Sequence, residues 1–287
     1  MKKLYVIIAG ASMLFLYSCQ QKMYFPDRAN TPGLIEAYEG KATFSIKPQT
    51  NDIGDIDSGR SSVNGAILSP SFDIAFAPAN HFGIIASYRS TLNRYIKEES
   101  STLFTEKNVG GKFNGHRFEI GAGYFNTFGN RGKVEVYAGY ANGVLKRRGV
   151  RRLNYDYDTR YHRYFVQPAI GFGTNRVSFT AGLRFSLHKY YDFKGLNDPT
   201  LYTYIAGDVN VENALFPFVE PFVNFEFGTE YIKFNAQVGF GTQMTQDNRV
   251  SGTAPMFVSL GVVGHYAPRF FARTQSGDNS NDRARGR

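Results

Sequence analysis

Apolar and polar residues alternate along two stretches of the sequence. In residues 177–187 the odd positions are apolar, from Val177 to Leu187, whereas the even positions are glycine or polar, as at Arg184. Residues 232–240 repeat the alternation in the opposite phase. Because successive side chains of a β-strand point to opposite faces of a sheet, the pattern predicts strands with one apolar and one polar face.

Weaker copies of this alternation fill most of the remaining chain. They lie at residues 42–46, 68–76, 82–88, 118–124, 134–140, 164–172, 219–227 and 256–262. The sum is about ten strands, within the range of bacterial outer-membrane barrels. The sequence therefore predicts an all-β fold, an antiparallel up-and-down transmembrane β-barrel of about ten strands over residues 41–267.

The links between these stretches alternate in length. Short links lie near residues 78–80, 127–132, 175–176 and 229–230, and long links lie near residues 49–62, 93–112, 145–159, 191–214 and 242–254. Outer-membrane barrels have short periplasmic turns and longer outer loops. An even number of strands would return both ends of the barrel to the periplasm.

The composition leaves one main rival fold. The chain is 42% hydrophobic and 16% aromatic and has no Trp. After residue 16 no apolar run is long enough for a transmembrane helix. Apart from a helix, only a closed β-barrel can satisfy all of its backbone hydrogen bonds within lipid. The rival is a soluble lipocalin-like barrel, which would have an apolar interior and a polar exterior.

The first residues have the form of a secretion signal. Lys2 and Lys3 precede an apolar run over residues 4–16, which is shorter than the roughly 20 residues of a membrane-spanning helix. The following Leu16-Tyr17-Ser18-Cys19 resembles the lipobox of bacterial lipoproteins, in which the cysteine becomes the lipidated first residue. Cys19 is the only cysteine, so it forms no disulfide within the chain.

The two ends of the chain lie outside the predicted barrel. We expect residues 1–18 to be a lipoprotein signal peptide and residues 19–40 a lipidated periplasmic linker. Gln20 is not acidic, and by resemblance to lipoprotein sorting rules this indicates the outer membrane. Residues 268–287 have no large apolar side chain after Phe271, so we expect a disordered periplasmic tail.

The polar face of the strands carries charges of both signs. We expect a lumen charge network of Arg117, Glu119, Arg184, Glu220, Glu226 and Lys233. A barrel of this size is only a little wider than one that side chains fill, which favours a plugged lumen over a wide pore. A two-residue turn at residues 229–230 would place Glu226 opposite Lys233 and allow an ion pair.

One long loop is strongly basic. Lys146, Arg147, Arg148, Arg151 and Arg152 lie within seven residues, and the formal net charge of the whole chain is +9. In an outer loop their expected partners are phosphates of the outer leaflet, as in lipopolysaccharide. Nucleic acid does not fit this compartment, and a solvated loop is the alternative.

Candidate catalytic side chains are few. Asp156, Asp158, His162, His188 and Asp192 could meet at the outer rim, but they do not reproduce the motif spacing of the ten-stranded outer-membrane proteases. Residues 51–59 hold three carboxylates without the terminal glutamate of a calcium loop. We therefore expect no catalytic residue, no metal site and no cofactor.

Several motifs resemble one family. Met23-Tyr24-Phe25-Pro26 and Asn30-Thr31-Pro32, followed by residues 134–140 (VEVYAGY) and 165–171 (FVQPAIG), are similar to a Bacteroidetes-type lipoprotein family of outer-membrane β-barrels with no assigned activity. The resemblance implies a lipid-anchored barrel and no reaction. Our interpretation is a non-enzymatic accessory or structural subunit that contacts outer-membrane lipid and other outer-membrane proteins. A small channel or solute-binding barrel and a rim hydrolase are the alternatives.

Overall fold

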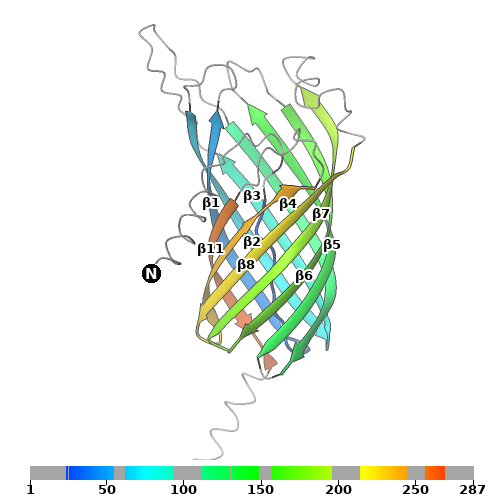
Figure 1. The fold of residues 1–287 in the computed structure, drawn as a ribbon, viewed down its shortest axis with the longest axis vertical. Coiled ribbons are helices and arrows are strands. Elements are labelled where there is room, and N and C mark those ends of the chain that lie inside the picture. Colours follow the sequence, from blue (N-terminus) through cyan, green and yellow to red (C-terminus); the bar gives the residue numbers. More distant parts are fainter. Residues whose placement is uncertain are drawn as a thin grey trace, which may run out of the picture.

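The computed structural model describes most of the chain between residues 24 and 268. The described residues are 24, 26–54, 62–93, 112–129, 131–148, 157–195, 214–244 and 256–268. They form one antiparallel sheet of tilted strands wrapped around a single axis (Figure 1). None of them forms a helix that is long and apolar enough to cross a bilayer.

Ten long strands and one short one make up the sheet. In chain order they are β1 (Gly40–Gly54), β2 (Ser62–Ala79), β3 (Phe82–Asn93), β4 (Lys112–Phe128), β5 (Gly132–Arg148), β6 (Tyr157–Gly173), β7 (Val177–Gly195), β8 (Phe216–Gly228), β9 (Ile232–Phe240), β10 (Thr242–Gln243) and β11 (Met256–Tyr266). Each strand from β1 to β9 pairs with the next, and the pairs β9–β11 and β11–β1 close the ring. The two-residue β10 follows β9 after Gly241 and also lies against β8. The structure confirms the antiparallel transmembrane barrel of about ten strands.

The two faces of the wall have opposite character. On β4, Phe118 points outward and is 54% exposed, whereas its neighbours Arg117 and Glu119 point inward and are 3% and 1% exposed. The same alternation continues along the whole of β6. An apolar exterior around a polar interior is the arrangement of a membrane barrel, and it is the reverse of a lipocalin-like barrel.

The two ends of the barrel differ in their connections. The short turns follow β2, β4, β6 and β8, and they lie at the lower end in Figure 1. We call this end the short-turn end and the opposite one the long-loop end. β1 starts and β11 finishes at the short-turn end.

The segment before β1 differs from the periplasmic linker expected there. Tyr24 and residues 26–39, which we call the lumenal segment, precede β1. Up to Leu34 the segment lies inside the barrel with most of its side chains buried, whereas Ile35 and Tyr38 are exposed at the short-turn end. The physical reason is that inward polar side chains of the wall complement the backbone of this segment. A plugged lumen was expected, but residues 26–34 were expected outside the barrel and not as part of the plug.

Candidate functional site: the occupied barrel lumen

Tyr24 anchors the lumenal segment near the long-loop end. Its ring stacks on Phe218 with 3.8 Å between the ring centroids, and its hydroxyl donates to Glu220. Arg163 forms an ion pair with the same carboxylate. Phe218 and Glu220 both belong to β8, so the first described residue is fixed to this strand by an aromatic and a polar contact.

Asp27 connects the segment to two cations of the wall. Its carboxylate oxygens lie 2.9 Å from Nζ of Lys47 and 2.8 Å from Nη1 of Arg117. Lys47 also donates to the carbonyl of Pro26 at 2.7 Å. One acidic residue of the segment therefore bridges β1 and β4, which are not neighbours in the sheet.

Arg28 of the lumenal segment carries a charge opposite to that of Asp27. Its Nε lies 3.5 Å from Asp73, and Asp73 also lies 3.1 Å from Nη2 of Arg89. Arg89 in turn donates to the carbonyl oxygen of Arg28. All three side chains are at most 5% exposed, so the single negative charge of Asp73 is shared by two buried guanidinium groups.

The next residues are held through their backbone. Ala29 donates its N–H to Oε1 of Gln237 at 2.7 Å, and Nε2 of Gln237 donates back to the Ala29 carbonyl at 3.0 Å. Gln167 donates to the carbonyl of Asn30 at 2.8 Å, while the Asn30 side chain donates to the Ile74 carbonyl at 3.1 Å. Amide side chains here replace the hydrogen bonds that a neighbouring strand would supply.

Three charged side chains hold the segment where it approaches the short-turn end. Lys41 donates to the carbonyl of Pro32 at 3.0 Å. Gly33 donates its N–H to Glu135 at 2.9 Å and accepts from Lys133 at 2.9 Å. Gly33 has a φ of 57°, a left-handed conformation that side-chain-bearing residues rarely adopt.

The segment ends in a reversal that leads into β1. Leu34 is buried in an apolar cluster with Ala77, Phe125 and Tyr137 near the short-turn end. The buried carboxylate of Glu39 accepts from the N–H groups of Ile35 and Glu36 and contacts Nε2 of His265. Glu39 therefore stabilises the reversal of chain direction after which β1 begins at Gly40.

All six residues of the expected lumen charge network lie inside the barrel. The carboxylate of Glu119 lies between Arg184 at 3.3 Å and Arg117 at 3.9 Å. Nε of Arg184 donates to Gln167 at 2.8 Å. Glu220 binds the lumenal segment through Tyr24, as described above.

The expected pairing of Glu226 with Lys233 is wrong. Glu226 lies opposite Asn235, and Lys233 lies opposite Gly228, because the β8–β9 turn is longer than two residues. The ion-pair partner of Glu226 is Lys41, at 2.6 Å.

The basic residues of the expected anion contact are only partly described. Lys146 is exposed on the outer face of β5, while Arg147 and Arg148 belong to the same strand and their side chains lie outside the described part. Arg151 and Arg152 lie outside the described residues altogether.

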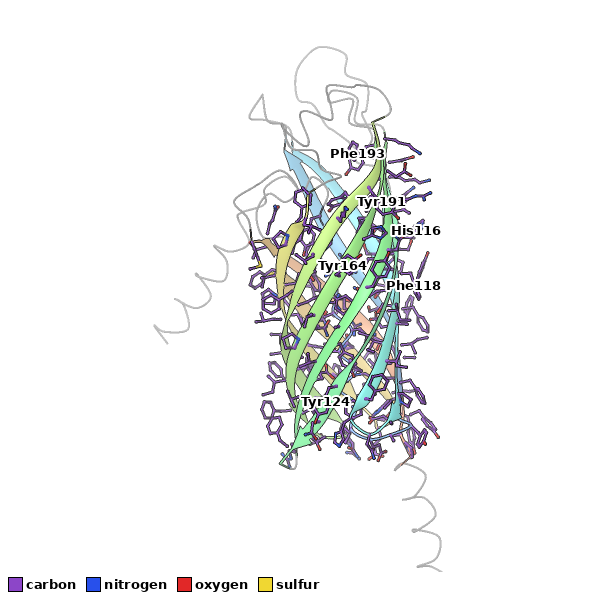
Figure 2. All side chains as sticks on the ribbon, turned by 90° about the vertical axis from the view of Figure 1, so that its right-hand side faces the viewer. His116, Phe118, Tyr124, Tyr164, Tyr191 and Phe193 are labelled. Atoms are coloured by element: carbon purple, nitrogen blue, oxygen red, sulfur yellow. The ribbon has the colours of Figure 1, made fainter. Side chains whose placement is uncertain are left out.

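Other cations join Lys146 on the outer face. In the strand pairing, Val144 lies opposite Arg160, and His162 lies opposite Lys189, so exposed cations of β5, β6 and β7 form one band. Tyr191 and His116 lie toward the long-loop end of this face, far from Tyr124 (Figure 2). Basic and aromatic side chains at one level are typical of a membrane–water interface.

The candidate catalytic residues do not come together among the described residues. His188 points inward and packs against Tyr24 and Phe218, whereas His162 points outward, bonds to Tyr140 and stacks on Tyr191. Asp156 lies outside the described residues. Asp192 lies 3.6 Å from Arg160 and 3.1 Å from Lys194. No group of three or more metal-binding side chains occurs within the described ranges.

The sequence analysis did not single out three inward amide side chains that line the lumen. Gln167, Gln237 and Asn224 lie among the inward positions and are almost fully buried. Side chains of this kind require hydrogen-bond partners when buried, and the backbone of Ala29 and Asn30 supplies partners to Gln237 and Gln167. An excess of inward amides is the feature that could have indicated a second chain segment in the lumen.

Comparisons with known proteins assign no family to the chain. No family model matches the sequence, and no curated protein matches it. Solved outer-membrane barrels do match in structure. Ail, the attachment invasion locus protein of Yersinia pestis, is 8% identical with a TM-score of 0.33, and the match covers 80% of this chain and 99% of Ail.

Two further barrels give similar values. The β domain of the Bordetella autotransporter BrkA is 10% identical with a TM-score of 0.43, and the match covers 80% of this chain and all of that domain. The outer-membrane protease OmpT of Escherichia coli is 11% identical with a TM-score of 0.38, covering 84% of this chain and 99% of OmpT. The barrel fold itself is established by the closed ring of paired strands described above.

Proposed function

We propose that this protein is a lipid-anchored, non-enzymatic outer-membrane β-barrel that serves as an accessory or structural subunit of an outer-membrane complex. The observation that carries this proposal is the occupied lumen. The lumenal segment is bound to the wall at nearly every residue from Asp27 to Gly33. Because the chain fills its own lumen, the surfaces that remain available to a partner are the outer wall, the loops and the two ends of the barrel.

The anchor is proposed from the sequence alone. Cys19 would carry the acyl chains, and it lies outside the described residues. Metabolic labelling with a fatty acid should mark the wild-type protein and leave a Cys19→Ala variant unmarked. Equal labelling of both proteins would remove the anchor from the proposal.

The subunit role is tested by purification from native outer membranes in mild detergent, followed by mass spectrometry. We expect defined outer-membrane partners at a fixed stoichiometry. As a control, the same tag on an unrelated barrel from that membrane should not recover them. Recovery of a monomer without partners would contradict the role as a subunit.

One observation favours a second candidate, a small channel. The wall around the lumenal segment is lined by charged and amide side chains such as Arg89, Glu135 and Gln237. A lumen of this kind would hold water if the segment left it. Steady conductance of the wild-type protein in planar bilayers would favour the channel over the subunit.

Phosphates of lipopolysaccharide are the proposed lipid partner. Lys146, Arg160 and Lys189 lie in the outward band defined above, at the level where the headgroups of an outer leaflet would lie. Charge-assisted hydrogen bonds from lysine and arginine are the usual means of binding phosphate.

A further inference from the structure

The lumenal segment runs through the barrel in a definite direction. It begins at Tyr24, near the long-loop end, and descends to Leu34 near the short turns. From this direction we infer that the mature N-terminus leaves the barrel at the long-loop end, so that a lipid on Cys19 would lie in the outer leaflet and the protein would be anchored at the cell surface. The part concerning the lipid rests on the proposed anchor.

The height of Tyr24 follows from its partners on the wall. Its ring packs edge-on against His188, which is eleven residues along β7 from Val177, the first residue after a short turn. At about 3.3 Å per residue and a strand tilt of about 40°, His188 is about 28 Å above the short-turn end.

The apolar exterior ends close to that height. The outward residues of β7 are apolar from Val177 to Leu187, and the next outward residue is Lys189. The apolar band of an outer-membrane barrel is about 25 Å tall. Tyr24 therefore lies at the edge of the band that is nearer the long loops.

The chain between Cys19 and Tyr24 is too short to return. Five residues span at most about 17 Å when fully extended. Reaching the short-turn end would require about 28 Å. That route is also filled by residues 26–34, and the described strands form a closed, hydrogen-bonded wall.

The long-loop end is the outer one by the general rule for these barrels. The turns β2–β3 and β6–β7 occupy residues 80–81 and 174–176, whereas β7 and β8 are joined by residues 196–215. Short turns face the periplasm and longer loops face outward. The outward cations Lys146 and Lys189 at the same end are consistent with an outer leaflet rich in phosphate.

The test is the accessibility of two epitope tags in intact cells. One tag is inserted between Gln21 and Lys22, and the matched control tag follows Asp278, beyond the short-turn end of β11. We expect antibody to reach the N-terminal tag on intact cells and the control tag only after the outer membrane is permeabilised. An N-terminal tag that is reached only after permeabilisation, or a control tag that is reached on intact cells, would overturn the inference.

A second variant keeps the test decisive if the tag prevents assembly. Gln21→Cys is treated with a membrane-impermeant maleimide on intact cells, with the parent chain as the control for any reaction of Cys19. Labelling of the variant alone supports an external N-terminus, and labelling only after permeabilisation contradicts it. Fatty-acid labelling separates the two proposals, because an external tag on an unlabelled protein would refute the anchor and leave the direction of the chain intact.

Discussion

Gln237 binds both backbone polar groups of Ala29. The Ala29 N–H lies 2.7 Å from Oε1, and Nε2 lies 3.0 Å from the Ala29 carbonyl oxygen. A residue of β9 thus gives the lumenal segment the two hydrogen bonds that a paired strand would give. Because both residues are buried, each bond replaces one to water that is lost on folding.

Replacing Gln237 by Leu should destabilise the barrel strongly. The buried N–H and carbonyl of Ala29 would lose their partners, at about 1–3 kcal/mol for each group. We expect a lower midpoint of thermal unfolding in detergent, followed by the change in gel mobility on heating. The matched control is Val238→Ala on the outward face of the same strand. Equal midpoints for wild type and Gln237→Leu would show that the segment is not held by this contact.

Asp73→Asn tests the buried charges. Asp73 compensates Arg28 of the segment and Arg89 of the wall, so its neutralisation leaves excess buried positive charge. We expect a loss of about 3–5 kcal/mol in the free energy of unfolding. Urea titration of the folded and unfolded forms would measure it.

Asp192→Asn is the control for Asp73→Asn, because it removes an exposed carboxylate instead of a buried one. Asp192 is 37% exposed and pairs with Arg160 and Lys194, which are more exposed still. Exposed ion pairs contribute about 0–1 kcal/mol. Similar losses for the two variants would mean that the Arg28–Asp73–Arg89 cluster is accessible to water.

The wall was predictable from the sequence because a strand repeats every two residues. Alternation alone assigns Arg184 and Glu119 to the lumen and Phe118 to the lipid face, as the structure has them. The pairing of Glu226 was not predictable in this way. The observed register of β8 against β9 differs from the expected one by two residues, and a shift of two leaves each residue on the same face of the sheet.

The lumenal segment could not be found by the same method. Residues 26–39 form no strand with the wall, and their partners Lys47, Gln167 and Gln237 are far away in the sequence. Periodicity reports on regular elements, whereas an irregular segment is held by individual side chains. Pro32 and Gly33 mark a break from strand structure but do not indicate where the segment goes.

Gly241→Ala should dislodge the outer end of the lumenal segment. A Cβ at this position would overlap the hydroxyl end of Tyr24. We expect the N-terminal tag described above to become more sensitive to added protease on intact cells. Gly264→Ala is the matched control, because a Cβ there would meet only the Ala42 carbonyl oxygen at 3.9 Å. Equal sensitivity of the two variants would show that Tyr24 can shift without releasing the segment.

Neutralising Lys146 and Lys189 together should weaken binding of lipopolysaccharide. A cation near an anionic lipid surface contributes about 1 kcal/mol, or about fivefold in affinity. We expect the double glutamine variant to bind purified lipopolysaccharide about 25-fold more weakly than wild type at low salt. The control is Arg131→Gln, which is exposed near the short-turn end. An effect of the same size in the control would indicate a general response to net charge.

Deletion of residues 24–35 should open a conducting path through the barrel. The deletion removes the buried Tyr24, Arg28 and Leu34 and leaves a wall that is lined by charged and amide side chains. Such a lumen is polar enough to fill with water, whereas an apolar cavity of similar size could stay dry. In planar bilayers we expect stepwise conductance from the deletion variant and none from wild type.

The deletion also shows whether the lumenal segment or the wall side chains block the lumen. Removal of residues 273–287 is the control and should leave the barrel silent, because this tail follows β11 at the short-turn end. Only protein that keeps the heat-dependent gel mobility of a folded barrel is compared. A folded deletion variant that does not conduct would mean that wall side chains such as Arg163 and Arg184 close the lumen by themselves, and the lumenal segment would then serve to fix the N-terminus and not to block a pore.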